Sequence, residues 1–157
     1  MRRFGMSRVH LVVVLAAALM GSLASATAKE MAKEKSLYDR LGGKTAIKAV
    51  VDEFVGRVGA DKRINAFFAA TVADPKRLED FKSKLVDQIC EASGGPCKYT
   101  GKDMKTAHMG LGVSGADFDA LVGDLVGALD KFKVGAHDKD QLLGVLGPMK
   151  GDIVEKK

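Results

Sequence analysis

Residues 94–113 read GGPCKYTGKDMKTAHMGLGV, and this stretch distinguishes the chain from an ordinary helical domain. Glycines stand at both of its ends, and no long apolar face of helical period runs through it. A loop of this length inside a compact domain is usually functional or disordered. Met104, Ala107, His108 and Leu111 supply enough apolar character for packing. We therefore predict that the stretch is functional.

The segments on either side of it have helical periodicity. Apolar residues recur there at steps of three and four, so one face of each segment is apolar. The segments with this pattern are residues 47–58, 78–92, 118–129 and 142–153. Pro148 should kink or interrupt the last one. Because no segment alternates with period two, the sequence predicts an all-α domain with four long helices.

Three helix start signals accompany this pattern. Asp74-Pro75 combines an N-cap residue with proline in the first turn. Ser114 followed by Asp117 resembles a capping box, with Asp in place of Glu. Asp138 followed by Gln141 repeats the signal, and His137 just before it is expected to be an exposed turn residue.

The N-terminus has the features of a secretory signal peptide. A basic start precedes an apolar run from Leu11 to Met20, and small residues in A-x-A patterns follow up to Ala28. The run is shorter than the roughly 20 apolar residues needed to span a bilayer. We predict a signal peptide at 1–28, a flexible leader at 29–35 and one domain at 36–157. The protein would be periplasmic or otherwise exported, with no stable membrane span after signal removal.

Charge gives little support for nucleic acid as a partner. The formal net charge of +5 falls to +2 when the predicted signal peptide, with three arginines and no acidic residue, is removed. Aromatic residues make up 6% of the chain and do not alternate with basic ones. Nucleic-acid-binding domains concentrate basic residues on one face, so we exclude that class.

Cysteine usage agrees with export. Cys90 and Cys97 are the only two cysteines, too few for a disulfide scaffold or a four-cysteine metal site. The absence of a C-x-x-C-H motif argues against covalent c-type haem attachment. We predict one structural disulfide, and a redox-active thiol pair is the alternative.

Histidines limit the chemistry further. His10 leaves with the signal peptide, so only His108 and His137 remain. Motifs of hydrolases, zinc proteases and phosphate-binding loops are missing. A single histidine can nevertheless be the whole protein contribution to a haem iron, and His108 suits that role. The alternative is a half-buried histidine that only packs.

Four motifs then carry a resemblance to the group I truncated haemoglobins. They are Y-D-R-L-G-G (38–43), F-F (67–68), G-G-P-x-x-Y-T-G (94–101) and M-K-x-x-H-x-G-x-G (104–112). Order and spacing match over residues 36 to 153. The resemblance implies a truncated globin with a two-over-two helical sandwich, whose region around Ser36 is a vestigial first helix. It also implies non-covalent haem b, with His108 as the proximal iron ligand.

On the distal side, the resemblance implies an apolar pocket. Val55 stands where many members have tyrosine, and Leu85 stands where they often have glutamine. Phe81 falls at the distal gate. The polar pair that holds bound dioxygen in those members is thus missing. Phe81, Lys84, Leu85 and Gln88 share one helix face, so Lys84 and Gln88 are the remaining polar candidates.

Lysines near the expected haem have alternative roles. Lys84 matches a position from which some relatives supply a sixth iron ligand, which requires a neutral amine. Otherwise it extends to solvent or pairs with a haem propionate. Lys102 and Lys105 are further propionate candidates. The other expected pocket residues are Val55, Phe67, Phe68, Phe81, Leu85, Ile89, Tyr99, Met104 and Leu111.

The sequence therefore predicts a haem-binding globin that reversibly binds oxygen, nitric oxide or carbon monoxide. Sensing, scavenging or slow redox chemistry fits an apolar pocket better than oxygen storage. Oxygen transport, a redox partner and enzymatic turnover such as nitric oxide dioxygenation stay open. One alternative is a six-coordinate electron-transfer protein with Lys84 on the iron. Another is a haem-free helical interaction module of the cell envelope.

Overall fold

The computed structural model describes residues 35–156, in which all regular secondary structure is helical. The predicted signal peptide and all but the last residue of the predicted leader lie outside the described residues. The elements are α2 (Leu37–Arg40), α3 (Gly43–Ala60), η2 (Asn65–Phe68), α4 (Ala69–Val72), α5 (Pro75–Ala92), α6 (Met104–His108), α7 (Gly115–Lys131), α8 (Ala136–Leu146), η3 (Gly147–Met149) and α9 (Lys150–Ile153). No helix within this range is long and apolar enough to cross a membrane.

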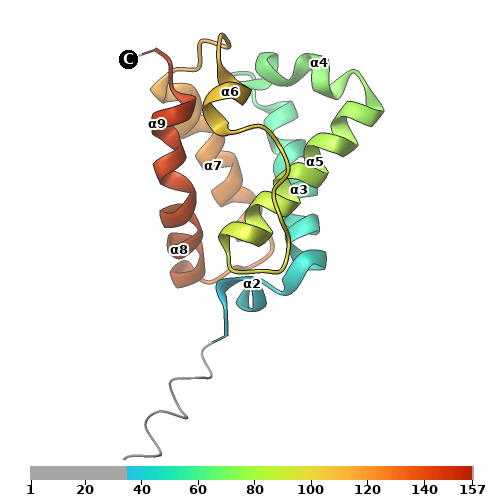
Figure 1. Ribbon diagram of the computed structural model, residues 1–157, viewed down its shortest axis with the longest axis vertical. Helices are drawn as coiled ribbons and strands as arrows, with labels where there is room; N and C mark the ends of the chain where they lie inside the picture. Colours follow the sequence, from blue (N-terminus) through green and yellow to red (C-terminus); the bar gives the residue numbers. More distant parts are fainter. Residues whose placement is uncertain (1–34, 157) are drawn as a thin grey trace, which may run out of the picture. The chain divides into compact units, whose positions relative to one another are not determined.

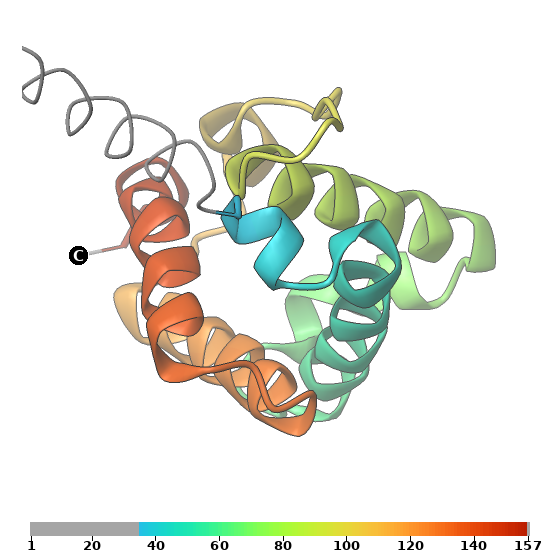
Figure 2. The ribbon, with the colours of Figure 1, turned by 90° about the horizontal axis from the view of Figure 1, so that it is seen from below.

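Helix α3 is the centre of the helix packing. Helix α3 packs against α5 and α7, and α9 packs against α6 and α7. Figure 1 shows α5 crossing α3, while α8 and α9 run nearly end to end beside α7. In the view from below, the short α2 lies among the ends of the long helices (Figure 2). This arrangement confirms the predicted all-α, two-over-two sandwich.

Two of the predicted helix starts have the expected hydrogen bonds. The Asp74 carboxylate accepts from the backbone N–H groups of Lys76 and Arg77, and Pro75 opens α5. Ser114 Oγ accepts from the Asp117 N–H at 3.2 Å, and the Asp117 carboxylate accepts from the Ser114 N–H at 2.9 Å. Both caps satisfy donors that the first turn of a helix leaves unpaired.

The predicted start at Asp138 is wrong. Helix α8 begins at Ala136, with Gly135 as the N-cap, so Asp138 lies inside the first turn. Its carboxylate accepts from Arg40 Nε at 2.7 Å, and this contact joins α8 to α2. His137 is exposed, but it belongs to α8 rather than to a turn. The Asp138 side chain thus forms a long-range ion pair with Arg40 instead of capping the helix.

The proline in the last segment acts as predicted. Helix α8 ends at Leu146, Pro148 lies in the 3-10 turn η3, and α9 resumes at Lys150. Proline lacks the N–H that continues a helix and clashes with the preceding turn. The interruption gives the C-terminal segment three short pieces instead of one long helix.

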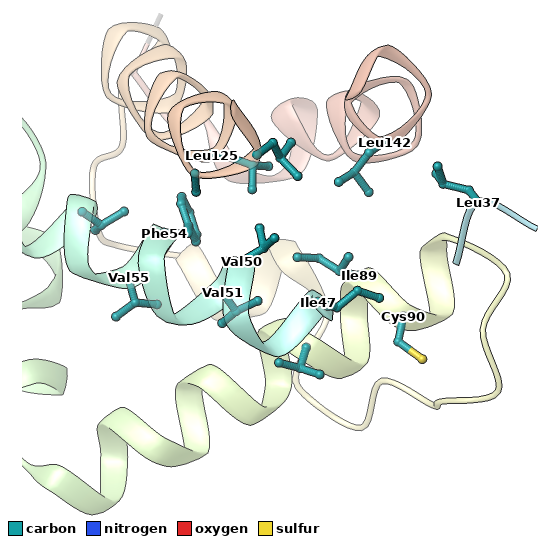
Figure 3. Close-up of a cluster of buried hydrophobic side chains, with 14 of the residues drawn as sticks. Leu37, Ile47, Val50, Val51, Phe54, Val55, Ile89, Cys90, Leu125 and Leu142 are labelled. Carbon is teal, nitrogen blue, oxygen red and sulfur yellow. The ribbon is translucent and has the colours of Figure 1, made fainter. Parts of the chain in front are cut away.

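The hydrophobic core lies where α3 meets its two neighbours. Phe54 points toward Leu125 of α7 in Figure 3, whereas Val55 points to the opposite side of α3. Val51 is fully buried and shares that opposite side with Val55. Helix α3 is therefore buried on two faces, and its packing against α5 and α7 holds it in place.

Candidate functional site

A cavity of about 450 Å³ lies among the helices. Its walls come from α3, η2, α4, α5, α6, α7, α8, η3 and α9 and from the loop before α6. Its size falls within the range of typical ligand sites, and its lining is mostly apolar, as such sites require. The predicted site residues that line it are Phe67, Phe68, Phe81, Lys84, Leu85, Ile89, Tyr99, Lys102, Met104, His108 and Leu111.

Two predicted site residues lie elsewhere. Val55 borders a separate void of about 10 Å³ beside Phe68 and Phe81, and the large cavity is lined by Phe54 instead. Successive residues of a helix point about 100° apart, so only one of the two neighbours faces the cavity. Lys105 is exposed on α6 and does not line the cavity.

The sequence did not predict many of the residues that line the cavity, including those of α7. The periodic segment of α7 indicated burial, but a pattern of this kind does not separate core from cavity. The sequence singles out Gln88 only as a polar candidate on the same helix face as Lys84. The further lining residues are Phe54, Ile64, Thr71, Gln88, Ala107, Val113, Asp117, Phe118, Leu121, Val122, Leu125, Leu146, Met149 and Ile153.

His108 is held in a defined orientation at the end of α6. Its Nδ1 atom lies 2.8 Å from the backbone carbonyl oxygen of Met104. A carbonyl oxygen can only accept, so Nδ1 carries a proton, and in the neutral imidazole Nε2 is then the ring atom with a free lone pair. Asp103 caps the helix by accepting from the Thr106 N–H at 2.9 Å. Hydrogen bonding to Thr106, through its side chain first and its backbone N–H second, holds the pKa of Asp103 below its usual value.

Tyr99 forms a polar edge of the cavity. Its hydroxyl donates to the Lys102 carbonyl at 2.8 Å, and its backbone N–H donates to the Glu91 carboxylate at 2.9 Å. Burial first, and the nearby Asp103 charge second, raise the pKa of Tyr99, so the phenol stays a donor. Tyr99 N–H and the Lys98 ammonium lower the pKa of Glu91. Together these contacts fix the loop before α6.

Gln88 faces the cavity rather than solvent. Its amide donates to the sulfur atoms of Met149 at 3.2 Å and Met104 at 3.6 Å. Thioether sulfur is a weak acceptor, so this amide is only weakly satisfied. Gln88 is therefore a polar group whose hydrogen bonds can be exchanged easily.

Phe68 of η2 and Phe81 and Leu85 of α5 form an apolar patch in the cavity wall. Phe68 and Phe81 pack with ring centroids 5.7 Å apart and planes inclined by 48°. Leu85 lies one turn beyond Phe81 on the same face of α5. No tyrosine or glutamine stands at the two positions where the sequence resemblance would place them.

A bare metal ion has no ready site in the part of the chain that the structure describes. Within residues 35–156, no three His, Cys, Asp or Glu side chains are grouped so that they could hold one. An iron beside His108 would need a cofactor that supplies most of its ligands.

Comparison with known proteins identifies the family. A model of the bacterial-like globins matches residues 36–155. The group 1 truncated haemoglobin of Mycolicibacterium paratuberculosis is 35% identical over 122 residues, which cover 78% of this chain and 86% of that relative. A counterpart from a Nostoc species is 35% identical over 121 residues, which cover 77% of this chain and 98% of the relative. The chain belongs to the group 1 truncated haemoglobins of this globin family.

Solved structures of truncated haemoglobins share the fold. The Fe(III) form from Tetrahymena pyriformis superposes with a TM-score of 0.70 at 29% identity, covering 78% of this chain and all of that one. A two-over-two haemoglobin from a Synechococcus species, with covalently attached haem, gives a TM-score of 0.70 at 30% identity and the same coverage. The fold prediction is thereby confirmed at the level of the family.

Membership in this globin family implies haem, and the residues present fit it. The truncated haemoglobin fold places a single histidine, with its proton on Nδ1, against a cavity that is otherwise mostly apolar. Globins hold haem iron through one such histidine. Lys84 and Lys102 line the same cavity and are suited to the two carboxylates of a haem.

Proposed function

We propose that this truncated haemoglobin holds haem b non-covalently, with Nε2 of His108 as the protein ligand to the iron. The observation that carries the proposal is the bond from His108 Nδ1 to the Met104 carbonyl, inside a cavity of about 450 Å³. A hydrogen bond at the far ring nitrogen fixes the tautomer and raises the basicity of a ligating histidine. His108 is oriented for this role by its own helix.

The other cavity residues would bind and shield the cofactor. Lys84 and Lys102 are placed to pair with the propionates, whereas Lys105 is not a wall residue. Phe68, Phe81 and Leu85 exclude water from the side that faces α5. When bound, haem supplies an iron whose remaining position can take a small diatomic gas.

The apolar wall determines which gas is favoured. Dioxygen on iron gains from hydrogen-bond donors, and carbon monoxide and nitric oxide need them less. Phe68, Phe81 and Leu85 offer no donor, and the Gln88 amide on the same helix already donates to Met149 and Met104. We therefore propose reversible binding of nitric oxide or carbon monoxide, with weak retention of oxygen, in a sensing, scavenging or slow redox role.

A second candidate function uses Lys84 as a sixth ligand in an electron-transfer protein. Lys84 lines the cavity and makes no ion pair among residues 35–156, whereas the neighbouring Lys82 pairs with Asp52 at 3.0 Å. This difference leaves the Lys84 amine available to the cavity. The redox partner would be a separate protein.

Export is part of the proposal. Its support is the signal-like sequence at 1–28 and the Cys90–Cys97 disulfide, a bond that persists in oxidising compartments. Fractionation of the native host, with an immunoblot of each fraction, tests it. Detection only in the cytoplasm, at the full-length mass, would reject export.

The absorption spectrum of the purified protein tests the central proposal. We expect a Soret band in the ferric and ferrous forms, and His108→Ala should weaken or shift it. His137→Ala is the matched control, since His137 is exposed at the start of α8 and does not line the cavity. Absence of a Soret band after haem reconstitution would instead support a helical interaction module.

A further inference from the structure

The turn that follows α6 has little to hold it in place by itself. Met109 and Leu111 are 72% and 47% exposed, so their side chains contribute little packing. Gly110 and Gly112 have φ values of +81° and +67°, a region that other residues adopt at a cost. Inside the turn, one bond joins the Leu111 N–H to the His108 carbonyl at 3.1 Å.

An acidic side chain from the C-terminal segment closes this turn from outside. Glu155 Oε1 accepts from the Gly110 N–H at 2.7 Å, and Oε2 accepts from the Gly112 N–H at 2.6 Å. These lengths are typical of charge-assisted hydrogen bonds. Successive backbone N–H groups in a turn make a concave site for an anion, and here the chain supplies its own carboxylate.

The backbone around Glu155 is itself anchored. The N–H groups of Glu155 and Lys156 both donate to the Val113 carbonyl, at 2.9 and 3.1 Å. Helix α9, which ends two residues earlier, packs against α6. The backbone that carries the Glu155 carboxylate is thus held by Val113, just after the turn, and by the packing of α9 against α6, just before the turn.

The helix that carries His108 needs such support. Helix α6 has five residues, and helices this short are not stable by themselves in water. Its N-terminal end is held by the Asp103 cap. At its C-terminal end, the described contacts to the turn from another part of the chain come from the segment 155–156.

We infer that Glu155 is a positioning residue for His108, whose imidazole it keeps in place by clamping Gly110 and Gly112. The inference rests on the proposed function in taking His108 as the iron ligand. A loosened turn would let α6 fray and the ring leave its bond to the Met104 carbonyl. Groups that orient a metal ligand from behind typically change metal affinity by about 10- to 100-fold when they are removed.

Glu155→Gln is the sharpest variant. It keeps the shape of the side chain but has a single acceptor oxygen, so one glycine N–H must lose its partner. Asp152→Asn is the matched control, because Asp152 is an exposed acid on α9 with no hydrogen bond among those of residues 35–156. Both variants remove one negative charge from the same end of the chain.

Three measurements on the full chain test the inference. Amide hydrogen exchange at Gly110 and Gly112, followed by NMR without haem, should become about 10-fold faster in Glu155→Gln. In the haem-loaded protein, haem transfer to excess apomyoglobin should accelerate about 10-fold, and the iron–histidine stretching band should shift or broaden. Asp152→Asn should match the wild type in all three.

The outcomes separate this inference from the proposed function. If His108→Ala loses the haem signature while Glu155→Gln behaves like the wild type, the positioning role is refuted and the proposed function stands. If Glu155→Gln accelerates exchange but His108→Ala leaves the haem spectrum unchanged, His108 is not the ligand and both are refuted.

Discussion

The Nδ1 atom of His108 lies 2.8 Å from the carbonyl oxygen of Met104, four residues earlier on α6. Met104 is the first residue of α6 and His108 is the last, so this bond spans the whole helix and fixes the ring against it. It also determines which ring nitrogen is available to the cavity. A local feature of a five-residue helix therefore sets the chemistry of the site.

Free imidazole should reverse the effect of removing the His108 side chain. His108→Gly removes the imidazole and leaves a space of its size beside the cavity, so haem should bind weakly with an altered Soret band. Added imidazole should restore the wild-type spectrum, because only the ligand atom is missing. A spectrum that stays altered at saturating imidazole would contradict the proximal role and indicate damage to α6.

Replacement of Lys84 should leave the iron coordination unchanged if the sixth position of the iron is open, as proposed. Lys84→Ala is expected to keep the ferric and ferrous spectra of the wild type. Lys82→Ala is the matched control, since Lys82 lies on the same helix but pairs with Asp52. Loss of a low-spin spectrum in Lys84→Ala alone would reject this prediction and support the six-coordinate alternative.

Reduction of the disulfide should destabilise the fold. Cys90 is fully buried and bonds to Cys97, seven residues later, which ties the end of α5 to the loop before α6. Closing so short a loop in the unfolded chain contributes about 2.5 kcal/mol on the chain-entropy model. Urea unfolding of the wild type should show a loss of this order when dithiothreitol is added.

The double variant Cys90→Ala with Cys97→Ala is the control for that measurement. It should be less stable than the wild type but insensitive to the reductant. Equal unfolding midpoints for the oxidised and reduced wild type would show that the cross-link adds no stability.

Asp124 on α7 should destabilise the protein at neutral pH. One of its carboxylate oxygens is buried without a hydrogen-bond partner among the described residues. Burial first, and the Asp61 charge second, raise the pKa of Asp124 above its ordinary value of 3.8, although Arg63 and Arg57 oppose this. A raised carboxyl pKa gives stability that is present below the ordinary pKa and lost as the pH rises through the folded-state pKa.

Asp124→Asn should therefore raise Tm at pH 7 and lose this advantage below pH 3.8, where the wild-type group is neutral as well. Asp140→Asn, at an exposed position of α8, serves as the control for removal of one charge. Differential scanning calorimetry of both variants at the two pH values measures the effect. A lower Tm of Asp124→Asn at pH 7 would contradict the predicted sign.

Local signals in the sequence determined much of the fold. The caps at Asp74 and Ser114 and the break at Pro148 involve residues that are at most a few positions apart, so their geometry follows from the chain itself. Helical periodicity likewise predicted the long helices. His108 could be singled out because the four motifs and the scarcity of histidine pointed to it.

Only the tertiary structure decided which side chains face the cavity and what holds them. Phe54 and Val55 are both apolar neighbours on α3, and the packing of α5 and α7 determines which one reaches the site. Asp138 resembled a cap but pairs with Arg40, 98 residues earlier. Glu155 clamps Gly110 and Gly112 across more than forty residues. Contacts between distant segments depend on how whole helices pack, and a pattern within a short stretch of sequence does not predict them.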